Sequence, residues 1–389
     1  MCPECVHAAF LVAMTNIGDR NSKFDSNVRS YSAITGGTYS SEIVVVPPLS
    51  NTEQGSDTKL LYSLDDPTFT TMFNDAGSGS LADADKFFNS FSYVQHLREG
   101  NYSLTLENGV SLLTKCKITD PQLYDRIHKG AAFYWLGMAA FLVHDYETAV
   151  FFFDSAVSED IRANKNPLKD STPSFHFILI EEDQPAQAAL ALVMATADLV
   201  ERALFQYNGR PGRSAVLELN DIREGFLRPA LSTEAKNWRS LATTFISFFL
   251  EWEYRRKLID LLPRVGTAEP FFLHLFKGCV LFESLLKANR LQPTAATTLD
   301  VVLNHLSSQL AIGSQLRLSS RSFSTVISDL QTADDQIQTA IEFTGKIRNT
   351  TGHNLGWSTN FASAEYHRLA GMVASSCLHA IASVYPQMN

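Results

Sequence analysis

The 389-residue chain lacks the long apolar runs of a membrane protein. A helix that crosses a bilayer needs about 20 apolar residues, and charged residues interrupt or border the two longest candidates, 133–153 and 241–250. The apolar segment 6–14 is short and has no basic residues before it, which is atypical of a secretion signal. We therefore expect a cytoplasmic protein with no membrane segment.

Cysteine is also scarce. Five cysteines in a chain of this length do not form a disulfide framework, and their odd number is typical of a reducing compartment. Cys2 and Cys5 have the spacing of zinc ligands, but no second pair of Cys or His follows at a suitable distance. We interpret them as incidental thiols, with a metal or redox role as the alternative, and we expect no metal and no cofactor.

The formal net charge of -9 argues against a general nucleic-acid coat protein. The charge is unevenly distributed, because residues 239–389 carry about +2 and the first 238 residues about -11. We therefore expect any nucleic acid to bind the C-terminal part. The acidic N-terminal part suits a basic protein partner, although such surfaces also serve solubility.

Composition and periodicity predict a mainly α protein of two or three domains. The chain is 45% hydrophobic, which is enough to build packed cores. Residues 1–80 form the least helical part, with short strand-like runs at 10–14 and 42–46 and polar loops such as 74–80. We expect a loop-rich N-terminal segment over 1–80 that contains one or two strands, a helical region over 81–234 and a helical bundle over 235–389.

A helical hairpin over 133–161 resembles a tetratricopeptide (TPR) repeat. Gly137, Ala149, Phe153 and Ala156 have the spacing of small and aromatic residues in that repeat, and 145–146 form the turn. Ile161 stands where the repeat ends in proline, and we find one good copy although a solenoid needs about three. A generic helical hairpin is the alternative to a TPR-like region.

Apolar spacing and Pro or Gly punctuation predict the remaining helices. The expected ranges are 186–207, 235–262, 269–291, 298–311, 322–347 and 358–385. In this C-terminal bundle we expect His274 and Cys279 to pack in the core. Of His367 and His379, we expect one to face solvent and the other the core.

One polar stretch, Arg348-Asn349-Thr350-Thr351-Gly352-His353-Asn354, follows the helix expected at 322–347. Arginine can hold phosphate oxygens with two parallel hydrogen bonds, and histidine transfers protons near neutral pH. Its first six residues resemble the Arg-polar-x3-His motif of the HEPN (higher eukaryote and prokaryote nucleotide-binding) superfamily. The helix expected at 272–289, with its segment 283–287, also resembles an earlier helix of HEPN domains, and the resemblance covers about residues 239–389.

This resemblance implies a metal-independent endoribonuclease that cleaves single-stranded RNA through attack by its 2′-hydroxyl. His353 would transfer a proton or position the phosphate, Arg348 would stabilise negative charge, and Asn349 would orient its neighbours or contact the phosphate. Thr350, Thr351 and Asn354 would contact substrate. HEPN nucleases are commonly homodimers with a composite active site, act in antiviral defence or as toxins, and respond to a protein or nucleotide activator.

Four alternatives remain open. Arg348 would instead bond the last carbonyl groups of its own helix, or the domain would have lost catalysis and serve as an interaction module. Arg255 and Arg256, in the charged run 251–257, would either follow an RNA backbone or belong to a solvated helix face. The competing function is a non-catalytic helical scaffold that binds partners through its TPR-like region.

Overall fold

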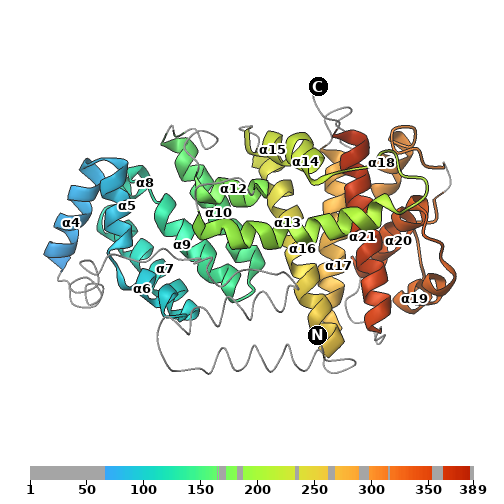
Figure 1. Ribbon diagram of the computed structural model, residues 1–389, viewed down its shortest axis with the longest axis horizontal. Helices are drawn as coiled ribbons and strands as arrows, with labels where there is room; N and C mark the ends of the chain where they lie inside the picture. The colour runs from blue at the N-terminus through green and yellow to red at the C-terminus, as the bar shows by residue number, and fades with distance from the viewer. Residues whose placement is uncertain are drawn as a thin grey trace. The chain divides into compact units, whose positions relative to one another are not determined.

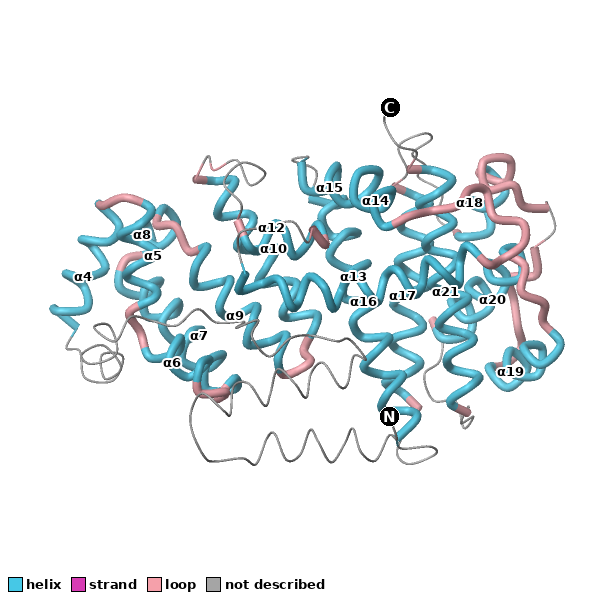
Figure 2. The backbone as a smooth tube through the Cα atoms, in the orientation of Figure 1, coloured by secondary structure: helices cyan, strands magenta, loops and turns pink. Residues whose placement is uncertain are grey.

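A computed structural model describes residues 66–163, 165, 172–181, 187–232, 236–261, 268–288, 298–313, 316–352 and 362–385. All regular structure in these ranges is helical (Figure 2), which confirms the mainly α class. None of the described helices is long and apolar enough to cross a membrane. The strands expected at 10–14 and 42–46, and the Cys2–Cys5 pair, lie outside the described residues.

The chain divides into two compact units, Met1–Ala195 and Thr196–Asn389. The division falls within one helix, α13. The described helices up to this division are α4 (Asp66–Ser78), α5 (Leu81–Asn89), α6 (Ser92–Arg98), α7 (Tyr102–Thr119), α8 (Pro121–Arg126), α9 (Gly130–Leu142), α10 (Tyr146–Arg162), α12 (Pro173–Leu179) and the start of α13 (Gln187–Asn208).

The polar loop expected at 74–80 is wrong for most of its length, because α4 continues to Ser78. The next helix then begins almost at once. Ser80 accepts a hydrogen bond from the backbone of Asp83, and the Asp83 side chain accepts one from the backbone of Ser80. This capping box satisfies backbone donors at the start of α5.

The expected hairpin at 133–161 is present as α9 and α10 (Figure 1). Asp145 caps α10 by accepting a hydrogen bond from the backbone of Thr148. A side chain at Gly137 would lie 2.8 Å from the Phe153 ring, so the glycine lets the two helices approach closely. A TPR repeat and a generic hairpin both need such packing.

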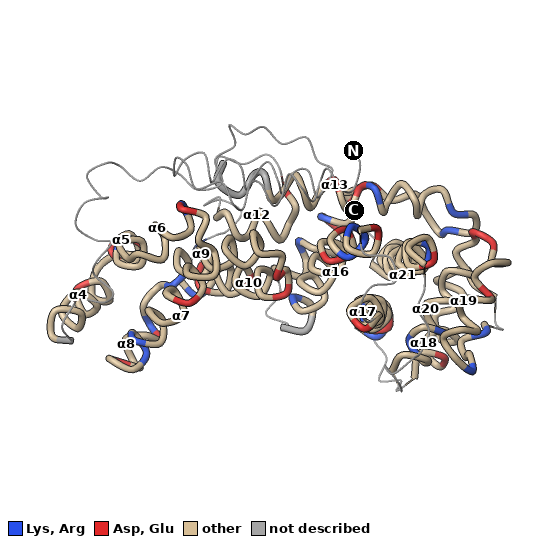
Figure 3. Tube along the Cα trace, turned by 90° about the horizontal axis from the view of Figure 1, so that it is seen from below, with Lys and Arg blue, Asp and Glu red and all other residues tan. Residues whose placement is uncertain are grey.

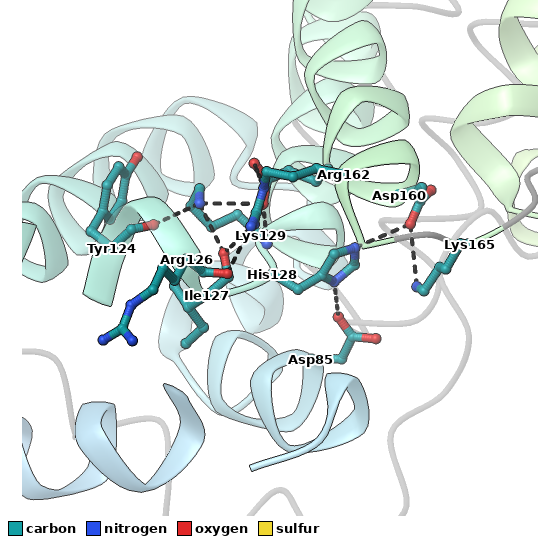
Figure 4. A network of polar contacts seen from close by, with 10 residues as sticks. Asp85, Tyr124, Arg126, Ile127, His128, Lys129, Asp160, Arg162 and Lys165 are labelled. Atoms are coloured by element: carbon teal, nitrogen blue, oxygen red, sulfur yellow. Dashed lines mark hydrogen bonds and ion pairs between the residues drawn. The ribbon is translucent and has the colours of Figure 1, made fainter. Parts of the chain in front are cut away.

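A partly buried polar cluster joins the turn before α9 to α5 and to the end of α10 (Figure 4). The two ring nitrogens of His128 lie 3.2 Å from an oxygen of Asp85 and 3.1 Å from an oxygen of Asp160. Asp160 also pairs with Lys165, and Glu159 pairs with Lys129 and Arg162. Burying charges is costly unless each has a partner, and here every member has one.

The second unit is a helical bundle. After α13 its described elements are α14 (Leu219–Ile222), the π-helix η1 (Arg223–Leu227), α15 (Arg228–Ser232), α16 (Lys236–Leu261), α17 (Glu269–Lys287), α18 (Leu299–His305), α19 (Phe323–Thr332), α20 (Ile337–Thr351) and α21 (Ser363–Val384). Helix α17 packs against α16, α20 and α21, and α21 also packs against α16 and α20 (Figure 1).

Two expected helices of this unit differ from the structure. The single helix at 322–347 is wrong, because α19 ends at Thr332 and α20 begins at Ile337. The Arg368 guanidinium donates hydrogen bonds to the carbonyl oxygens of Leu330 and Ala333 and so satisfies the end of α19. The helix at 298–311 is shorter than expected, since α18 ends at His305 and turns follow.

Candidate functional site

Helix α20 carries the first part of the polar motif on its last turn. Ile337, Ile341 and Ile347 are buried on its apolar face. The helix runs four residues beyond the expected end at Ile347, to Thr351, and the Gly352 backbone then donates to the Arg348 carbonyl oxygen at 3.0 Å. The Arg348 side chain therefore projects from a regular helix and not from a loop. The helix fixes the position of the Arg348 backbone.

The Arg348 guanidinium binds a carboxylate on a different helix. Its Nε donates to Oε2 of Glu283, on α17, at 2.8 Å. Lys287 Nζ donates to the other oxygen of Glu283 at 2.5 Å. The side chain of Glu283 is only 6% exposed, whereas that of Arg348 is 31% exposed. A buried carboxylate thus holds Nε of a guanidinium whose side chain is partly exposed.

Asn349 links Arg348 to a segment distant in the sequence. Its Oδ1 accepts a hydrogen bond from Nη1 of Arg348 at 3.3 Å. Its Nδ2 donates to the carbonyl oxygen of Leu318 at 2.8 Å. The expected role of orienting neighbours therefore fits Asn349 better than direct phosphate contact.

The two threonines of the motif are buried. Thr351 Oγ1 donates to the Ile347 carbonyl oxygen within the same helix at 2.6 Å. Thr350 Oγ1 is also enclosed and has no hydrogen-bond partner among the described residues. Neither hydroxyl is presented to solvent, so the structure favours packing roles over the expected contacts of Thr350 and Thr351 with substrate. His353 and Asn354 lie outside the described residues.

Arg255 and Arg256 lie on α16, where acidic residues bind both. Arg255 pairs with Glu251 at 3.5 Å, and Arg256 makes two hydrogen bonds with Glu253 at 2.7 and 2.8 Å. Glu251 and Glu253 are each only 7% exposed, so a fully solvated face is wrong for them. Figure 3 shows both signs of charge along this helix. No contact joins the two arginines to Arg348 in the described part of the chain.

The other singled-out residues of this unit have structural roles. His274 and Cys279 are buried, as expected. Burial lowers the pKa of His274 to about 3, so that its ring is neutral while it bonds Tyr366 and the Phe248 carbonyl. His379 is in the core, while His367 is part-exposed and pairs with Asp260 at 2.9 Å.

Sequence reasoning missed two parts of this site. Glu283 and Lys287 were noticed only as part of a resembling helix, although their four-residue spacing is that of an ion pair on one helix face. Leu318 contributes only its carbonyl oxygen, a group that no side-chain pattern can reveal. Among the described residues, no group of three His, Cys, Asp or Glu side chains is arranged to hold a metal ion.

Comparison of the chain with protein-family models, with curated proteins and with solved structures gave no match.

Proposed function

We propose that this protein is a metal-independent endoribonuclease of HEPN type, with Arg348 and His353 as its catalytic residues. The 2′-hydroxyl oxygen of the substrate attacks the adjacent phosphorus, and the bond from phosphorus to the 5′-oxygen breaks. The 2′-hydroxyl proton passes to a base, and the departing 5′-oxygen takes up a proton. The products are a 2′,3′-cyclic phosphate and a 5′-hydroxyl end.

The observation that carries this proposal is the way Arg348 is held. Its side chain neither bonds the carbonyl groups of its own helix nor lies buried: Nε donates to Glu283, Nη1 donates to Asn349, and the side chain remains 31% exposed. A guanidinium fixed in this way is preorganised to donate to the oxygens of a phosphorane, which gain negative charge as the 2′-oxygen attacks. The 2′-hydroxyl requirement makes RNA the substrate and excludes DNA.

His353 supplies the proton transfer in this proposal. It follows Arg348 by five positions, just beyond the end of α20. An imidazole with a pKa near 6.5 can accept the 2′-hydroxyl proton in its neutral form and donate to the 5′-oxygen when charged. A homodimer would supply a second Arg348–His353 pair to one composite site, and mass photometry would then give twice the 43.2 kDa of one chain.

The test is cleavage of a labelled single-stranded RNA in excess EDTA, with product ends identified. We expect cleavage by the wild type to persist in EDTA, to leave cyclic phosphate, and to be lost in Arg348→Ala and in His353→Ala. Asp300→Asn, a surface change on α18 outside the motif, serves as the control for purity and handling. Cleavage that persists in both motif variants would exclude the motif as the active site.

The second candidate is a non-catalytic scaffold that binds partners through the α9–α10 hairpin. The ion pair between Arg348 and Glu283 favours it, because that contact also joins α20 to α17 as a structural tie. In that case Arg348→Ala would lower the free energy of unfolding, and no RNA would be cleaved under any condition. Cleavage by the wild type separates the two candidates, because loss of the ion pair lowers the free energy of unfolding in either case.

A further inference from the structure

The connection between α18 and α19, here called the 306–322 loop, packs along one face of α20 (pink in Figure 2, described at 306–313 and 316–322). The backbone of Gly313 donates to Oε1 of Gln338 at 3.2 Å. The Leu318 side chain covers Gly345, where a Cβ would lie 2.6 Å from it. Asn349 then donates to the Leu318 carbonyl oxygen. Positions 338, 345 and 349 are seven and four apart and so share one face of a helix.

Two arginines of this loop, Arg317 and Arg321, have exposed side chains and make no ion pair with any described residue. Most other described arginines of the second unit do pair with a carboxylate. Arginines of that unit with a carboxylate partner are Arg202, Arg210, Arg228, Arg255, Arg256, Arg348 and Arg368. Arg317 and Arg321 are therefore available for an anion from outside the chain.

The acidic side chains near this face are mostly neutralised by other cations. Asp329, on α19, pairs with Lys346 at 2.7 Å. Glu283 pairs with Lys287 and Arg348. Glu342 lies on the same face of α20 as Gln338 and Gly345, and it forms no ion pair with either loop arginine among the described residues. Arg317 and Arg321 thus add two positive charges that form no ion pair with a described carboxylate.

A continuous set of contacts connects the loop to the candidate catalytic arginine. Asn349 accepts from Arg348 through one end of its amide and donates to Leu318 through the other. Arg317 is the neighbour of Leu318 in the chain, so its backbone is held beside the last turn of α20. An arginine side chain spans several ångströms, which is the scale on which charges repeat along a nucleic-acid strand.

We infer that Arg317 and Arg321 bind backbone phosphates of the RNA strand that flank the phosphate held by Arg348. This inference rests on the proposed function and specifies how that site takes its substrate. Guanidinium groups bind phosphate with two parallel hydrogen bonds. Such contacts set the position of the strand without reading its sequence. Asn349 fixes the loop relative to Arg348 and is a positioning residue.

The experiment measures RNA binding apart from cleavage. A labelled single strand carrying 2′-O-methyl groups has no attacking hydroxyl, so its fluorescence anisotropy reports binding alone at several salt concentrations. For single strands the slope of log K against log salt is about 0.7 per phosphate contact. The double variant Arg317→Ala/Arg321→Ala should therefore lower the slope by about 1.4 and weaken binding at low salt.

Two further variants control for charge. Arg317→Lys/Arg321→Lys keeps both charges and should largely keep the slope. Arg126→Ala/Arg228→Ala removes two charges from α8 and α15, outside the loop and α20, and should leave the slope unchanged. An unchanged slope in Arg317→Ala/Arg321→Ala, an equal decrease in the Arg126→Ala/Arg228→Ala control, or no RNA binding by the wild type would overturn the inference.

Cleavage of the same strand with free 2′-hydroxyls separates this inference from the proposed function. A lower slope in the loop variant with no cleavage by the wild type would support the loop as an RNA-binding element and contradict the ribonuclease proposal. Cleavage by the wild type with an unchanged slope in the loop variant would support the ribonuclease proposal and contradict the loop as an RNA-binding element.

Discussion

A single buried carboxylate, Glu283, organises the candidate site. It accepts hydrogen bonds from Lys287 and Arg348 at its two oxygens. A buried acid with two cationic partners has its charge compensated, and each cation in turn has its position restricted. Glu283 therefore matters both for the stability of the bundle and for the orientation of Arg348.

We predict that Glu283→Gln lowers the free energy of unfolding by about 1 to 2 kcal/mol, because it leaves two part-exposed cations without their shared anion. It should also reduce kcat for RNA cleavage more than it raises KM, since Arg348 loses its orientation. Urea unfolding and steady-state kinetics measure the two effects. Glu342→Gln, on α20 but without an ion pair among the described residues, is the matched control and should change neither quantity. Equal effects of the two substitutions would contradict the role of Glu283.

In the first unit, the protonation state of His128 follows from its two neighbours. Only the imidazolium form can donate from both ring nitrogens, and both lie against carboxylate oxygens. Burial disfavours this charge, but the hydrogen bonds to Asp160 and Asp85 outweigh burial and the nearby Lys165, and they raise the pKa of His128 above its ordinary value of 6.5. The groups around it are Asp85 from α5, Glu159, Asp160 and Arg162 from α10, Lys165 after it, and the adjacent Lys129.

The raised pKa sets the sign of the pH dependence. The stabilisation by His128 is complete below pH 6.5, the value in the unfolded chain, and is lost as the pH rises through the higher value of the folded protein. We predict that His128→Gln costs about 2 kcal/mol at low pH and less as the pH rises. Burial lowers the pKa of His144 to about 4, so the pH dependence of its contribution has the opposite sign, and stability is lost as the pH falls. The measurement is therefore the difference in unfolding free energy between wild type and His128→Gln across pH 5.5 to 9. A difference that stays constant over this range would contradict the imidazolium assignment.

At the scale of elements, the α9–α10 hairpin depends on one missing side chain. Replacing glycine by alanine inside an exposed helix usually stabilises it by about 1 kcal/mol. At Gly137 the added Cβ would lie 2.8 Å from the Phe153 ring, which is closer than van der Waals contact allows. We predict that Gly137→Ala destabilises the protein by about 1 to 3 kcal/mol through overpacking.

A double-mutant cycle with Phe153→Leu tests this explanation. The smaller leucine removes the clash, so Gly137→Ala should cost less in the Phe153→Leu background than in the wild type. Additive costs in urea unfolding would show that Gly137 does not owe its role to contact with Phe153.

The elements that the sequence predicted well are those whose ends depend on local chemistry. Helices expected at 186–207 and 235–262 occur at Gln187–Asn208 and Lys236–Leu261. The interruption between α19 and α20 was not predictable, because Arg368, from another helix, satisfies the carbonyl groups at the end of α19. In the candidate site, too, some residues could be predicted from local sequence and others could not. Arg348 at the end of a helix could be predicted from the motif, but its partner Glu283 lies 65 positions away, and Leu318 contributes only backbone.

At the scale of the whole molecule, the distribution of charge bears on where the proposed RNA substrate would bind. Residues 239–389 carry about +2, whereas the first 238 carry about -11. Phosphate groups are repelled by a strongly acidic surface over about one Debye length, about 8 Å at physiological salt. A strand held at Arg348 and the 306–322 loop therefore has a favourable surface only within the C-terminal part.

We predict that ultraviolet crosslinking of a single-stranded RNA to the intact protein, followed by mass spectrometry, gives crosslinked peptides from residues 239–389 and few from 66–238. Because the attraction is electrostatic, the yield should fall steeply with salt, and it should fall further in Arg317→Ala/Arg321→Ala. The Arg126→Ala/Arg228→Ala variant has the same change in charge and should keep the wild-type pattern. Crosslinks concentrated on the α9–α10 hairpin would instead assign RNA binding to the first unit. They would mean that a local contact there overcomes the repulsion of its acidic surroundings.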